Sequence, residues 1–95
     1  MEISTSSNIV TITGNIKSVS DFQQIKETLD SVTRQNKSVT INIVDSLSIT
    51  SSVIGYLNKL ILKDKIDVNM KIANAQLIDL LDELNLTSLF KVRKG

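Results

Sequence analysis

Three hydroxyl side chains, those of Thr50, Ser51 and Ser52, are clustered near the middle of the chain, and Ser48 lies just before them. They follow an apolar segment, residues 39–44, and precede a segment with helical spacing. A hydroxyl group at the start of a helix can cap it, because its oxygen accepts a hydrogen bond from a free backbone N–H group. It can also carry a phosphoryl group, since the N-terminal end of a helix favours negative charge. The cluster therefore predicts a helix cap or a phosphorylation site.

Other kinds of chemistry have little support in the composition. The 95 residues include no cysteine and no histidine, which excludes disulfides, thiolate nucleophiles, imidazole bases and Cys/His metal sites. Asp21 and Asp45 are the candidate carboxylate pair, but we interpret Asp21 as part of a helical first turn and Asp45 as part of a loop turn. Gly14 belongs to no glycine-rich phosphate loop. We therefore expect no enzyme activity, no catalytic residue, no metal and no cofactor.

The charge and hydropathy patterns narrow the class of partner. Eleven basic and ten acidic residues give a net charge of +1, which offers no argument for binding to nucleic acid or to an anionic membrane. The N-terminal residues carry an early acid and no apolar run typical of a signal peptide. No stretch approaches the ~20 apolar residues that span a bilayer. We therefore expect a cytoplasmic protein that does not insert into a membrane.

Periodic apolar residues predict the elements that position the hydroxyl cluster. The expected strands are β-branched or alternate between apolar and polar side chains, over residues 2–6, 9–13, 39–43 and 66–72. Helical spacing follows in residues 22–32, 53–61 and 77–84. Ser20 and Gln23 fit a capping box. Asn74 is a favourable N-cap, and Asn85 can adopt the left-handed conformation that ends a helix.

The resulting order, β-β-α-β-α-β-α, predicts an α/β fold. Strands that alternate with helices pair in parallel through right-handed crossovers, so we expect a small mixed sheet of four to five strands with a largely parallel core. One strand face is polar, and the three or four helices should therefore lie mainly on the other face. No proline, repeat or linker divides the chain, which predicts a single domain over residues 1–95 and an apolar tail, residues 86–92, that packs back on it.

Three segments of the chain resemble the STAS domain, a family shared by sulfate transporters and anti-sigma factor antagonists. Residues 9–16 are similar to the family's strand that ends in Gly-x-Leu or Gly-x-Ile. Residues 39–57 resemble its apolar strand, loop and Asp-Ser-Ser-Gly-Leu-Gly helix start. Residues 72–90, with Leu80-Leu81 and Leu89-Phe90, are similar to the family's C-terminal pattern. The resemblance covers nearly the whole chain and implies a single STAS-like domain.

The resemblance implies a bacterial partner-switching protein that regulates transcription. In stand-alone family members, a GHKL-type kinase that is also an anti-sigma factor phosphorylates the first Ser of the motif, and a PP2C-type phosphatase removes the phosphate. The unphosphorylated protein binds the kinase and so frees a sigma factor. Aligned on Gly55, the implied phosphorylation site is Ser51, with Ser52 and Thr50 as alternates. The implied partner contacts are Asp45, Ser46, Ser48, Thr50, Ser51, Ser52, Val53 and Tyr56.

Three positions depart from the family pattern and support an alternative. Thr50 replaces the Asp of the motif, Val53 replaces the Gly after the serine pair, and Asn42 stands where an Asp often ends the strand. We expect Val53 to fill space that a glycine would leave open to a partner. The alternative is a STAS subunit that does not switch, such as one attached to an ABC-type lipid transporter. In either case we expect a monomer or a weak dimer.

Overall fold

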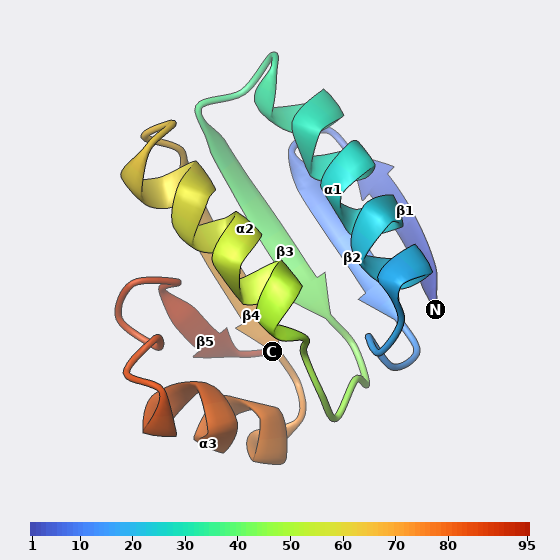
Figure 1. Ribbon diagram of the computed structural model, residues 1–95, viewed down its shortest axis with the longest axis vertical. Helices are drawn as coiled ribbons and strands as arrows, with labels where there is room; N and C mark the ends of the chain where they lie inside the picture. Colours follow the sequence, from blue (N-terminus) through green and yellow to red (C-terminus); the bar gives the residue numbers. More distant parts are fainter.

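The computed structural model describes residues 1–95, which form five strands and three helices (Figure 1). In chain order the elements are β1 (Glu2–Ser6), β2 (Ile9–Thr13), α1 (Val19–Thr33), β3 (Ser38–Ile43), α2 (Ser51–Leu62), β4 (Asp67–Ile72), α3 (Ala75–Glu83) and β5 (Val92–Lys94). The strands form one sheet in the order β1-β2-β3-β4-β5, in which β1 and β2 are antiparallel and all other pairs are parallel. The predicted α/β class and the largely parallel sheet are confirmed.

The strand order explains where the helices lie. Each crossover moves one strand along the sheet in the same direction, so right-handed crossovers carry the helices to one face. Figure 1 shows α1 and α2 side by side over that face, with α3 near the end of the sheet. The order never reverses, and the sheet therefore has no switch point of the kind where open α/β sheets bind ligands. Candidate sites therefore lie on the loops, on the outer helix surfaces or on the uncovered face of the sheet.

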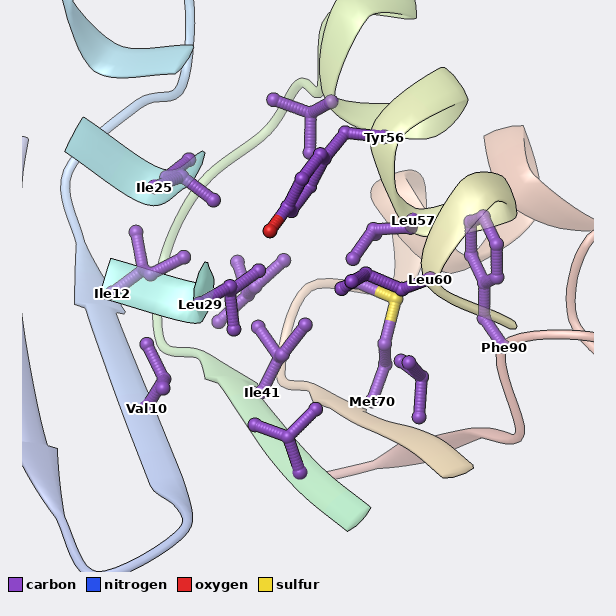
Figure 2. Packing of buried hydrophobic residues seen from close by; sticks show 14 of the residues in the cluster. Val10, Ile12, Ile25, Leu29, Ile41, Tyr56, Leu57, Leu60, Met70 and Phe90 are labelled. Atoms are coloured by element: carbon purple, nitrogen blue, oxygen red, sulfur yellow. The ribbon is translucent and has the colours of Figure 1, made fainter. Parts of the chain in front are cut away.

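The covered face of the sheet supports an aliphatic core (Figure 2). The parallel register aligns Val10, Ile41 and Met70 across three strands, and all three side chains are buried. Leu29 from α1 and Leu57 from α2 pack against them. Burial of each such side chain contributes about 1.5–3 kcal/mol. This core fixes the two long helices on the sheet and thereby the loops at their N-terminal ends.

The opposite face of the sheet is polar and carries no helix. Its central row runs through Thr11, Asn42, Lys71 and Arg93 on four neighbouring strands, and none of these residues is buried. This arrangement agrees with the prediction that the helices lie mainly on one face.

The N-terminus of α1 differs from the prediction, because Ser18 and not Ser20 is the N-cap. The Ser18 hydroxyl accepts the N–H of Asp21, whose carboxylate accepts the N–H groups of Ser18 and Lys17. Those backbone hydrogen bonds hold the pKa of Asp21 below its ordinary value. An acid at this position satisfies two free N–H groups at once, which explains why the helix begins earlier than the Ser20–Gln23 pattern indicated.

The C-terminal segment contains a strand that the sequence did not predict. Phe90 is fully buried, as expected for a tail that packs back on the domain, but Val92–Lys94 also pairs in parallel with β4 as β5. Two of its three residues are charged, so it has no apolar alternation, and only backbone pairing defines it. The predicted helix ends hold at α3, where Asn74 is the N-cap and Asn85 has a φ of 59°.

Candidate functional site

Two loops meet at the carboxyl edge of the sheet, residues 14–18 after β2 and residues 44–50 after β3. They start side by side because β2 and β3 are parallel neighbours. The Gly14 N–H group donates to Asp45 Oδ1 at 2.7 Å, and the Leu47 N–H group donates to Asn15 Oδ1 at 2.9 Å. The Asp45 carboxylate therefore holds one loop to the other. Asp21 belongs to the α1 cap, and the interpretation of these two acids as structural is confirmed.

Ser46 joins the two loops from inside. Its side chain is 0% exposed, and its hydroxyl donates to the Ser48 carbonyl at 2.7 Å. The same oxygen accepts the N–H groups of Ile16 at 3.1 Å and of Ser48 at 3.3 Å. The Ser48 hydroxyl in turn donates to the Ile16 carbonyl at 3.0 Å. Both hydroxyls are thus occupied in holding the loops together.

Thr50 is the N-cap of α2. Its side chain accepts the Val53 N–H group at 3.3 Å, and the helix begins at the next residue. The capping interpretation of the hydroxyl cluster is confirmed for this residue. One hydroxyl is sufficient for a cap, so the cap leaves the remaining two hydroxyls available for other roles.

Ser51 and Ser52 are the exposed hydroxyls of the cluster, and neither side chain makes a hydrogen bond within the protein. They occupy the first two helical positions of α2, where backbone N–H groups have no intrahelical acceptor. A phosphoryl group on Ser51 would lie next to these donors and to the positive end of the helix dipole. The site can therefore carry a dianion without unfolding the helix.

Val53 and Tyr56 lie beneath the exposed surface of α2, and both are buried. Val53 points into the core, so it does not fill the outer surface beside Ser51, contrary to the expectation from the sequence. The burial of Ser46, Val53 and Tyr56 makes them supports of the site, whereas Ser51 and Ser52 are accessible to a partner.

Tyr56 connects α2 to α1, toward which its ring projects in Figure 2. The phenol donates a hydrogen bond to Asp30 Oδ1. The ammonium groups of Lys26 and Lys59 lie 5.8 and 5.7 Å from the ring centroid. The Phe22 ring packs edge-on against it at 6.3 Å. Sequence reasoning missed the Asp30 partner, because a contact between residues 26 positions apart leaves no local pattern.

The pairing of Tyr56 with Asp30 shifts both pKa values. Burial and the hydrogen bond to the carboxylate raise the pKa of Tyr56 far above the ordinary phenol value. Burial opposes ionisation of Asp30, but hydrogen bonds from Tyr56 and Lys26 outweigh it, and the pKa of Asp30 is lowered. A lowered pKa means that ionised Asp30 stabilises the fold above the ordinary carboxyl pKa, and that this contribution is lost as the pH falls through the folded-state pKa.

We expect the Tyr56→Phe substitution to raise the pKa of Asp30, because it removes one of the two hydrogen bonds that favour the carboxylate. The acid-dependent part of the stability should shrink with it. An NMR titration of the side-chain carboxyl carbons measures this shift. Asp67, whose lowered pKa depends on Lys91, is the internal control and should not change. An unchanged pKa at Asp30 would contradict the pairing.

Gly55 lies one helical turn after Ser51 on the exposed face of α2. A Cβ atom placed there would meet nothing within 4 Å, so packing does not require a glycine. A glycine in the interior of a helix costs about 1 kcal/mol relative to alanine. Its presence leaves a strip of bare backbone next to the two free hydroxyls, which permits close approach by a partner.

We expect Gly55→Ala to raise the free energy of unfolding by about 0.5–1 kcal/mol, because the helix gains propensity without a clash. Chemical denaturation measures the change. Gly14→Ala is the contrasting variant: Gly14 has a φ of 84°, and a Cβ would lie 3.0 Å from the Met1 Cα atom, so it should destabilise. Destabilisation by Gly55→Ala would contradict the open space around Gly55, because it would mean that the added Cβ atom meets a neighbouring group.

No group of three or more Asp or Glu side chains is placed to hold a metal ion. None of the helices is long and apolar enough to cross a membrane. Comparisons with protein-family models, curated proteins and solved structures found no match to this chain.

Proposed function

We propose that this chain is a cytoplasmic partner-switching protein of the STAS type, controlled by phosphorylation at Ser51. The observation that carries the proposal is the division of labour among the hydroxyls: Ser46, Ser48 and Thr50 hold the loops and the helix, whereas Ser51 and Ser52 are exposed and free. The choice of Ser51 over Ser52 rests on the resemblance aligned on Gly55. The partners are a GHKL-type kinase that is also an anti-sigma factor and a PP2C-type phosphatase.

The switch needs no large conformational change. A phosphoryl group adds roughly 1.5 to 2 negative charges at neutral pH. In the free protein that charge is exposed to water at a helix N-terminus. A partner that covers the neutral Ser51 hydroxyl would have to desolvate a dianion. A shift from nanomolar to micromolar affinity corresponds to about 4 kcal/mol, which one buried phosphate can supply.

Phosphorylation by a cognate GHKL-type kinase tests the proposal. The protein is incubated with the kinase and ATP, and mass spectrometry locates the phosphate. We expect modification of Ser51, its loss in Ser51→Ala, and its retention in the matched variant Ser52→Ala. If the phosphate is instead lost in Ser52→Ala and kept in Ser51→Ala, the phosphorylation site is Ser52. The proposal is refuted if no such kinase phosphorylates the protein and none binds it.

A second candidate is a non-switching STAS subunit of an ABC-type lipid transporter. The residue before Ser51 is a neutral threonine committed to capping α2, so a kinase would find no carboxylate there. In that case a pull-down from membranes should recover the protein together with its transporter. The Ser51→Ala variant should function as the wild type does and should still bind the transporter. Recovery with a soluble kinase would favour the first candidate.

A further inference from the structure

A groove of about 280 Å³ lies between the outer surface of α3 and the loop that follows β3. We call it the α3 groove, and it is lined by Leu47, Gln76, Asp79, Leu80 and Glu83. Leu47 is 48% exposed and Leu80 is 37% exposed, so two large apolar side chains face water here. The groove offers room and apolar surface for a side chain from outside.

The α3 groove is acidic as well as apolar. Asp79 and Glu83 lie one turn apart on the same side of α3, and the helix contains no basic residue. Neither carboxylate takes part in a salt bridge within the protein. An occupant must therefore present an apolar side chain surrounded by positive charge.

The chain itself carries a surface of that chemistry at the end of α2. Leu62, the last residue of the helix, is 61% exposed, and we call it together with Lys59, Lys63 and Lys65 the α2 knob. Lys59 is paired with Asp64 at 3.0 Å, whereas Lys63 and Lys65 have no acidic partner. The knob thus matches the α3 groove in its exposed apolar side chain and complements it in charge.

The knob and the groove of one molecule cannot meet. Leu47 precedes the start of α2, and Leu62 is the last residue of this 12-residue helix, whose two ends lie about 17 Å apart along its axis. Figure 1 shows α3 at one end of the molecule and the C-terminal end of α2 toward the opposite end. The α3 groove can therefore be occupied by the α2 knob only when that knob belongs to a second copy of the protein.

We propose that the protein self-associates head to tail, with the α2 knob of one molecule in the α3 groove of the next. Such a contact joins two different surfaces, so it is heterologous and extends into an open chain of molecules unless the rotation closes a ring. A single leucine in a small groove makes a weak interface, and screening of the lysine and carboxylate charges by salt weakens it further. The proposal does not depend on phosphorylation of Ser51, which is distinct from both surfaces.

Sedimentation analysis of the full chain over a range of concentrations tests the proposal. At low salt we expect the average mass to rise beyond twice the 10.5 kDa of one chain, and to fall back at 0.5 M NaCl. Leu62→Ser and Leu80→Ser should each be monomeric. Val19→Ser, at an exposed apolar residue of α1 outside both surfaces, is the matched control and should associate as the wild type.

Mixing the two monomeric variants separates this contact from a symmetric one. Leu62→Ser keeps an intact groove and Leu80→Ser keeps an intact knob, so the mixture should form one-to-one dimers of about twice the monomer mass and nothing larger. Circular dichroism of each variant confirms that it is folded. A wild type that stays monomeric at low salt, association that survives either substitution, or a mixture that does not dimerise would overturn the proposal.

Discussion

Replacing Ser46 with alanine is expected to lower the free energy of unfolding by about 2–4 kcal/mol, a large loss for one oxygen atom. The buried Ser46 hydroxyl makes three hydrogen bonds, of which the one to Ile16 is buried and the two to Ser48 are partly buried. Alanine leaves the N–H groups of Ile16 and Ser48 and the Ser48 carbonyl without this partner. The buried N–H group of Ile16 costs about 1–3 kcal/mol when it loses its hydrogen bond, and the partly buried groups of Ser48 add a smaller cost because water can replace part of what they lose.

Thermal unfolding measures this effect directly. A loss of this size should lower the melting temperature by roughly 10–20 °C in a domain of this length. Ser51→Ala is the matched control, since it removes the same atom from an exposed residue of the same segment and should change stability by less than about 0.5 kcal/mol. Equal effects of the two substitutions would show that Ser46 does not join the loops.

The elements that position the site follow from local patterns in the sequence. β-branched and alternating residues in β2, β3 and β4 are spaced at the strand period, and the apolar residues of α1, α2 and α3 are spaced at the helical period. The Asn74 cap is likewise predicted from residue type and position, and the cap of α2 is predicted to lie within the hydroxyl cluster, where the structure places it at Thr50. Periodicity indicates which face of each element is buried, and these buried faces supply most of the core residues.

The connections between the loops could not be predicted in the same way. Asp45 binds Gly14, Ser46 binds Ile16, and Tyr56 binds Asp30, in each case across 26 to 31 residues of sequence. Such pairs depend on which strands become neighbours, and a local pattern contains no information about that. The hydroxyl cluster therefore looked uniform in the sequence. The fold divides it into hydroxyls that build the site and hydroxyls that face the solvent.

Phosphorylation of Ser51 is expected to weaken binding to the kinase by about 10³-fold, if the proposed switch operates. The affinity of the phosphorylated protein, measured by titration calorimetry, is compared with that of the unmodified protein. Ser51→Glu carries only one charge and should weaken binding less. Ser31→Glu places the same charge on the exposed surface of α1 and is the control that should leave the affinity unchanged.

The stability of the modified protein decides how the phosphate acts. At the N-terminus of α2 the added charge should stabilise the helix by about 0.3–1 kcal/mol, because it faces free N–H groups and the positive end of the dipole. Loss of affinity together with an unchanged or higher melting temperature therefore means that the phosphate repels the partner from a folded surface. Loss of affinity together with a lower melting temperature would mean that it disrupts α2, and would contradict a site preformed for phosphate.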